Sequence, residues 1–321
     1  QAMDHHQIKF SASNHPYRSY SDFLQEFFAD GKVQKVSIDA GCSCPNRDGT
    51  KGMGGCTYCN NRTFSPDYCR RVKSVSEQMK AGIRFFARKY AHMKYLAYFQ
   101  AYTNTYGSVE SLIQKYEEAL ACPDVAGLVV STRPDCMNED LLHYFEQLGK
   151  RCFVLIEYGI ESTLDRTLMR VNRCHTEAQT EEAIRRTGEC GIFVGAHLIL
   201  GLPGESREEM LHHADVLSTL PVDTLKIHQL QVIRGTRMAC EFKEMKEAFS
   251  LFTIDEYIDL LIDFIERLNP AIAIERFVSQ SPKSLLIAPD WGLKSQAFSE
   301  RIAQRFAGRN TWQGRLFTAY P

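Results

Sequence analysis

The sequence predicts an α/β protein with a parallel sheet, folded as one barrel-like domain with extensions at both ends. Segments with the 3.6-residue period of amphipathic helices separate short apolar runs that have the composition of buried strands. Strands that alternate with helices in this way form right-handed βαβ units, which build a doubly wound sheet or a full or partial barrel. Both architectures gather the loops after the strands at one edge, so we expect the chemistry there. Six strands are predicted, at residues 36–40, 95–100, 127–131, 153–160, 193–200 and 224–232.

The helix predicted at residues 109–120 carries the clearest local signals. Its apolar side chains recur at spacings of three and four residues, and Ser108 precedes them as an N-cap. The remaining helices between the strands are predicted at residues 76–90, 139–148, 177–190 and 208–217.

The pattern changes after residue 235. Residues 241–266 carry eight acidic and two basic side chains, around an apolar helix at 257–268, and a strand-like piece follows at 271–274. Six βα repeats fall short of the eight in a full barrel, and no low-complexity linker divides the chain. We therefore expect an N-terminal extension at residues 1–32, a barrel core at 33–235 and a C-terminal helical extension at 236–321 that packs on the barrel.

Composition excludes several classes of protein. The 321 residues are 44% hydrophobic and 24% charged, which is typical of a globular chain. A net charge of −1 gives no overall attraction to nucleic acid or membrane, and no run approaches the roughly 18 apolar residues of a transmembrane helix. Eleven cysteines, an odd number without a signal-like apolar stretch, argue against a secreted disulfide framework. We expect a cytoplasmic protein whose cysteines are packing residues or metal ligands.

The loop after the first strand concentrates four cysteines and five glycines in residues 41–60. Glycines let a backbone wrap closely around a bound group, and thiolates select zinc or iron–sulfur clusters. Three alternatives fit: cysteines that only pack, a four-cysteine zinc site, or a cluster held by three cysteines with one iron open. The one-residue spacing of the first pair is shorter than a usual zinc knuckle. The cysteines are Cys42, Cys44, Cys56 and Cys59.

The pattern Cys44-x11-Cys56-x2-Cys59, with Tyr58 before the last cysteine, resembles the cysteine loop of the radical S-adenosylmethionine (SAM) superfamily. Its long first gap is similar to the branch that contains the catalytic subunit of the elongator complex. The stretches 44–52, 98–106, 131–136 and 197–205 resemble a bacterial family of that branch, and the likeness spans about residues 15–315. No segment after residue 235 has the length or pattern of an acetyltransferase domain.

This resemblance implies a partial (βα)6 TIM-like barrel and a radical SAM enzyme. Cys44, Cys56 and Cys59 would hold a [4Fe–4S] cluster, and Cys42 would be a spare thiol. Fed by a one-electron reductant such as flavodoxin or ferredoxin, the cluster would cleave SAM to a 5′-deoxyadenosyl radical, which abstracts hydrogen from a substrate. An open iron and a low potential suit this chemistry.

The resemblance also implies the residues that bind SAM. Polar side chains after the second strand would take the amino group, a guanidinium would take the carboxylate, and a glycine turn would approach the adenine. A polar turn and a surface arginine are the competing interpretations. The residues are Tyr58, Gln100, Thr103, Asn104, Thr132, Glu161, Arg173 and Gly201.

The sequence does not decide the roles of three further side chains or the identity of the substrate. His197 and His228 lie inside strands, where they either line the cavity on the substrate side or are satisfied core residues. Glu157 lies four residues before Glu161 on one face of a strand, where unpaired carboxylates are costly to bury and paired acid/base work is the alternative. Elongator relatives act on transfer RNA, and the basic tail, with arginines at 301, 305, 309 and 315, offers phosphate contacts or a solvated helix face. The alternative function is a zinc-stabilised nucleic-acid-binding protein that uses all four loop cysteines and this tail.

Overall fold

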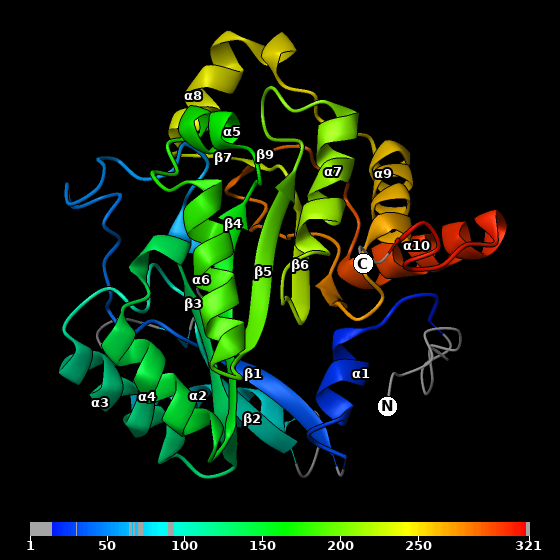
Figure 1. Ribbon diagram of the computed structural model, residues 1–321. Helices are drawn as coiled ribbons and strands as arrows, with labels where there is room; N and C mark the ends of the chain where they lie inside the picture. The colour runs from blue at the N-terminus through cyan, green and yellow to red at the C-terminus, as the bar shows by residue number, and fades with distance from the viewer. Residues whose placement is uncertain are drawn as a thin grey trace.

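A curled, seven-stranded parallel sheet forms the centre of the computed structural model, which describes residues 15–318 apart from 30, 64–65, 67, 70–72 and 89–92. The strand order is β1-β2-β3-β4-β5-β6-β8, and helices cover its outer face (Figure 1). Every neighbouring pair is parallel. The predicted α/β partial barrel is therefore confirmed, and the strand-like piece expected at 271–274 corresponds to β8, which is a seventh strand of the sheet. In order, the strands span Lys32–Ile38, Met93–Phe99, Val125–Thr132, Phe153–Glu161, Phe193–Leu200, Thr224–Gln229 and Ala273–Arg276.

The crossover helices begin where the sequence supplies a capping side chain. In each, a Ser, Thr or Asn N-cap accepts a hydrogen bond from the backbone of the third helical residue, which satisfies one of the unpaired amides of the first turn. The caps of the second, third, fourth, sixth and seventh helices are Ser74, Ser108, Asn138, Thr176 and Ser206. These helices are α2 (Val75–Ala87), α3 (Val109–Leu120), α4 (Glu139–Gly149), α6 (Glu177–Glu189) and α7 (Arg207–Leu217). The predicted end of α2 at residue 90 lies outside the described residues.

The interior of the half-barrel is layered along the strands. At the amino ends of the strands, Phe23 and Leu24 of α1 (Tyr20–Gln25) pack with the interior residues Leu96, Val129 and Leu155. A layer of charged side chains lies next along the strands, and a cavity opens at their carboxyl ends. Because α1 closes the half-barrel at the amino ends of the strands, a ligand would enter at the carboxyl ends, where the cavity lies.

The segment after residue 235 contributes helices and strands. α8 (Arg237–Glu244), α9 (Ile254–Arg267) and α10 (Ser295–Arg309) follow the barrel, while β8 joins the central sheet beside β6. The predicted strand over 224–232 is divided: β6 ends at Gln229, and after two residues β7 (Val232–Ile233) pairs with β9 (Leu286–Ala288) instead. The described residues also form the short helix α5 (Asp165–Arg170) and 3-10 turns at Asn61–Thr63, Pro134–Cys136 and Lys246–Ala248.

The basic tail pairs with the acidic face of α9. Arg305 lies 2.9 Å from Asp255 and also contacts Asp259, and Arg309 contacts Asp263. These arginines therefore have partners within the chain. In the part of the chain that the structure describes, no helix combines the length and apolarity needed to span a membrane.

Candidate functional site

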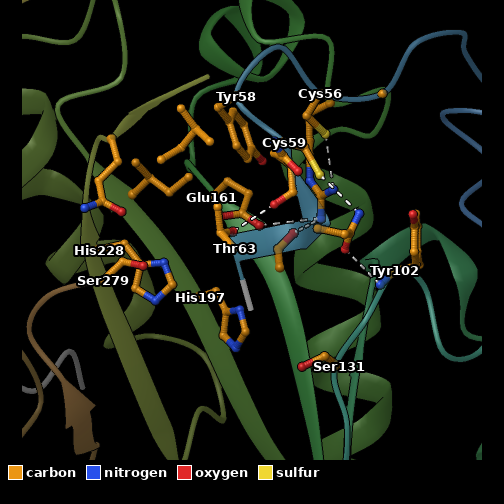
Figure 2. Close-up of a pocket in the computed structure, with 18 of the residues that line it drawn as sticks. Cys56, Tyr58, Cys59, Thr63, Tyr102, Ser131, Glu161, His197, His228 and Ser279 are labelled. Atoms are coloured by element: carbon orange, nitrogen blue, oxygen red, sulfur yellow. Dashed lines mark hydrogen bonds and ion pairs between the residues drawn. The ribbon is translucent and has the colours of Figure 1, made fainter. Parts of the chain in front are cut away.

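A cavity at the carboxyl ends of the strands collects residues from almost every loop at that edge. Figure 2 shows Cys56, Tyr58 and Cys59 on one side of it and His228 and Ser279 on another. Cys44 also lines the cavity, so the structure brings all three predicted ligands to one place. Most of the predicted cofactor residues line it as well: Tyr58, Gln100, Thr103, Thr132, Glu161 and Arg173.

The fourth cysteine of the loop points elsewhere. Cys42 is buried in the main hydrophobic core, and it does not line the cavity. The loop then folds back on itself, with the amide of Arg47 bonded to the Cys44 carbonyl and that of Gly55 to the Asn46 carbonyl, each at 2.8 Å. Among the described residues, no three His, Cys, Asp or Glu side chains are grouped to hold a single metal ion.

Nitrogen donors approach the cysteine sulfurs. Asn46 Nδ2 and Arg173 Nη1 each lie 3.6 Å from Cys56 Sγ, and Asn61 Nδ2 lies 3.7 Å from Cys59 Sγ. Such N–H contacts stabilise negative charge on sulfur and tune iron–sulfur clusters. N–H donors therefore lie near the sulfurs of Cys56 and Cys59, although burial, together with Cys56, raises the pKa of the Cys59 thiol to about 11.

Arg173 and Glu161 form an ion pair on the cavity wall. Arg173 Nη2 donates to the Gly159 carbonyl and lies 3.8 Å from Glu161 Oε1, while its Nε has no partner among the described residues. Burial raises the pKa of Glu161, and its φ of 68° at the end of β4 turns the chain there. The pair leaves one guanidinium nitrogen available for a bound anion.

Two of the predicted cofactor residues are not brought to the cavity. Asn104 is fully buried, and its Nδ2 donates to the carbonyls of Phe99 at 3.0 Å and Ser131 at 2.9 Å, which ties β2 to β3. Gly201 lies in the turn after β5 with φ of 92°, where an added Cβ would lie 3.0 Å from Phe252.

Glu157, His197 and His228, whose roles the sequence does not decide, lie in the charged layer or line the cavity. Glu157 accepts hydrogen bonds from Lys35 at 2.6 Å, Lys226 at 2.7 Å and His197 at 3.1 Å. Burial acts to raise the pKa of Glu157, but Lys226 and Lys35 outweigh it and hold that pKa well below its ordinary value. Burial, with Lys226, lowers the pKa of His197 to about 4. At neutral pH the carboxylate is therefore ionised and the imidazole is neutral, and His197 also lines the cavity.

Sequence reasoning missed several residues of the site. Asn46 and Arg47 stand between the predicted ligands, so their position in the loop was the available signal. Arg276 and Ser279 also line the cavity, and no motif marks them, because Arg276 ends the short strand β8 and Ser279 follows it. Arg133 also lines the cavity, and it forms an ion pair with Asp135 at 2.9 Å.

Comparison with known proteins gives the family. Residues 46–217 match the model of the radical SAM superfamily, and residues 222–307 match that of the radical SAM C-terminal domain. The chain is 33% identical over 315 residues to "Uncharacterized protein YtqA" of Bacillus subtilis (strain 168), covering 98% of this chain and 97% of the relative. It is 34% identical over 263 residues to "Protein YhcC" of Escherichia coli (strain K12), covering 81% and 82% respectively.

A solved structure shares the fold. The archaeal Methanocaldococcus infernus Elp3 with an N-terminal deletion superposes with a TM-score of 0.67 at 17% identity, covering 88% of this chain and 64% of that one. The family match covers the cysteine loop from Asn46 and all six cavity-lining residues predicted to contact the cofactor. The resemblance seen in the sequence is confirmed, and the chain belongs to the radical SAM superfamily.

Proposed function

We propose that this radical SAM enzyme holds a [4Fe–4S] cluster on Cys44, Cys56 and Cys59 and binds SAM beside it in the cavity. The observation that carries the proposal is the separation of the four loop cysteines. Three line the cavity, two of them with N–H donors at their sulfurs, while Cys42 packs in the core. Three thiolates leave one iron of a cubane open, which is the arrangement that a coordinating cofactor needs.

The residues around the cysteines fit such a pair of cofactors. Arg173 Nε and the Tyr58 hydroxyl are buried without a partner among the described residues, although both residues line the cavity. A buried polar atom without a partner is costly unless a ligand satisfies it. The carboxylate and the sugar of SAM would supply acceptors for these atoms.

Each side chain then has a role that matches its chemistry. Arg173 takes the SAM carboxylate, and Gln100 and Thr103 take the amino group. Glu161 accepts hydrogen bonds from the ribose hydroxyls, and Tyr58 packs on the adenine or covers the cluster. Thr132, whose hydroxyl lies 2.6 Å from that of Thr105, is held beside the ribose or methionine portion.

When bound, the cluster passes one electron from a reductant such as flavodoxin or ferredoxin to SAM, and cleavage of the carbon–sulfur bond gives a 5′-deoxyadenosyl radical that takes hydrogen from the substrate. The protein binds and orients the reactants and excludes water from them. We place this reaction in the cytoplasm, where a reducing environment keeps the remaining cysteines as thiols.

Neither the zinc alternative nor an RNA substrate gains support. A four-cysteine zinc site needs Cys42, whose side chain is buried in the core. Arg305, Arg309 and Arg315 pair with acidic residues of α9, so the basic tail gives no argument for phosphate contacts.

Anaerobic reconstitution tests the proposal. The wild-type chain should take up about four irons and release 5′-deoxyadenosine when SAM and dithionite are added. Cys56→Ala should lose both properties, and Cys42→Ala, the matched control from the same loop, should keep them. A colourless protein with one zinc per chain, lost in Cys42→Ala, would overturn the proposal.

A further inference from the structure

Arg276 is a cation of the cavity wall that lacks an acidic partner. It ends β8, and its Nε donates a hydrogen bond to His228 Nε2 at 2.9 Å. Arg276 and His228 both line the cavity. Within the described part of the chain, Arg276 forms no ion pair with an Asp or Glu side chain. The terminal nitrogens of the guanidinium are therefore available to a ligand.

The charges around Arg276 are already balanced. Lys35 and Lys226 neutralise Glu157 and Glu275, with the four nitrogen–oxygen distances between 2.6 and 3.3 Å. On the cofactor side, Arg173 pairs with Glu161 and Arg133 with Asp135.

One other cation of the cavity wall has no acidic partner among the described residues. Arg47 lies beside the cysteines and donates to the Cys59 carbonyl at 3.0 Å, where cluster thiolates would balance it. Arg276 adds one positive charge to the far side of the cavity, and nothing described there offsets it.

Two neutral donors, His228 and Ser279, line the cavity together with this cation. Burial and Arg276 together keep the pKa of His228 well below its ordinary value, so the ring is neutral. Because Nε2 accepts from Arg276, the ring proton resides on Nδ1 and can be donated. Ser279 is held in place by Gln229, which accepts from its amide at 2.9 Å and donates to its carbonyl at 3.0 Å. Figure 2 shows His228 and Ser279 together, away from Cys56 and Cys59.

We propose that Arg276, His228 and Ser279 form a substrate subsite that binds an oxyanion, a carboxylate or a phosphate group. A guanidinium fork with adjacent neutral donors is the arrangement that planar or tetrahedral oxyanions bind. The inference rests on the proposed function, because it assigns the substrate side of the same cavity. Arg173 then holds the anionic end of SAM, and Arg276 holds that of the substrate, so the substrate is positioned by one end on the wall of β8.

Calorimetric titration with inorganic phosphate and, separately, with acetate tests the subsite and distinguishes the two oxyanions. The reconstituted protein, saturated with SAM, should bind one of them at a single site. Arg276→Gln should weaken that binding at least tenfold, and Arg276→Lys should weaken it less, because it keeps the charge without the fork. Arg301→Gln removes the same charge from the exposed face of α10 and should leave binding unchanged.

Ser279→Ala, a small change that preserves packing, should weaken binding several-fold and guards against misfolding of the arginine variants. Binding of neither oxyanion, equal binding by Arg276→Gln, or displacement of the oxyanion by SAM would each overturn the proposal, the last because Arg276 would then belong to the cofactor site. Repeating the titration with cluster-free Cys56→Ala separates the two proposals: oxyanion binding there, together with failure of the wild type to cleave SAM, supports the subsite and removes only the radical SAM chemistry.

Discussion

Lys226 Nζ lies 2.7 Å from Glu157 Oε2 inside the half-barrel, and both side chains are at most 3% exposed. Lys35 of β1 completes the set, with its Nζ 2.6 Å from Glu157 and 2.7 Å from Glu275 of β8. Since β1 and β8 are the two edge strands of the sheet, this contact bridges its open side. The charged layer therefore holds together strands that share no backbone pairing.

Removing one charge from this layer should destabilise the fold. Glu157→Gln leaves two buried lysines facing Glu275 alone, and an uncompensated buried charge costs about 3–5 kcal/mol. Glu181→Gln makes the same change at an exposed pair with Arg185 and should cost less than about 1 kcal/mol. Urea unfolding at pH 7 measures both free energies. Equal, small losses in the two variants would show that the layer does not stabilise the barrel.

His197 should make the protein sensitive to acid. Its pKa of about 4 in the folded chain lies below the ordinary value near 6.5, so the unfolded chain binds the proton first as pH falls. The free energy of unfolding is therefore highest above pH 6.5 and falls as pH falls toward 4. The loss due to His197 is about 2 kcal/mol at pH 4.5.

His197→Gln keeps an N–H donor for Glu157 but cannot titrate. The drop in the free energy of unfolding between pH 7 and pH 4.5 should therefore be about 2 kcal/mol smaller in this variant than in the wild type. Comparing the two chains in parallel cancels the titration of the other groups. An identical drop in both would contradict the assignment.

The sequence predicted the bounds of a strand best where both of its ends are apolar. The bounds of β5, 193–200, are those expected, whereas β1 begins at Lys32 rather than Val36. The start of β1 was missed because it is polar. Lys35 can face the interior because it forms ion pairs with Glu157 and Glu275, which come from strands distant in the sequence. A pattern based on apolar residues cannot anticipate a charged layer.

The same limit applies to the site. The cysteine spacing predicted three residues that all line the cavity. Asn104 belongs to an equally clear motif, but its side chain does not line the cavity and donates to backbone carbonyls instead. A motif locates a turn without giving the direction of each side chain in it. Arg276 shows the converse, since its lack of an acidic partner is visible only once the strands are assembled.

Asn46 should raise the reduction potential of the cluster. Its Nδ2 lies 3.6 Å from Cys56 Sγ, and a hydrogen bond to sulfur favours the more negative, reduced cluster. Loss of about 1 kcal/mol corresponds to about 40 mV for one electron, so Asn46→Ala should lower the potential by about that amount. A redox titration followed by electron paramagnetic resonance measures it.

Asn60→Ala is the control for this shift. Asn60 lies in the same loop, but its Nδ2 donates to the Arg234 carbonyl rather than to sulfur. The reduction potential of the cluster in Asn60→Ala should match that in the wild type. A fall of equal size in both variants would mean that the loop, and not the contact with Cys56, sets the potential.

Gly159 should be needed for full SAM affinity, because a side chain there would meet the Arg173–Glu161 pair. An added Cβ would lie 2.7 Å from Glu161 Oε1 and 2.8 Å from Arg173 Nη2, so both side chains would have to move. Gly159→Ala should therefore weaken SAM binding about tenfold, or about 1.4 kcal/mol, and leave the iron content unchanged. Gly149→Ala, where a Cβ meets no atom within 4 Å, should bind SAM normally. Equilibrium dialysis with the reconstituted proteins decides the matter, since equal affinity in both variants would remove Arg173 and Glu161 from the SAM site.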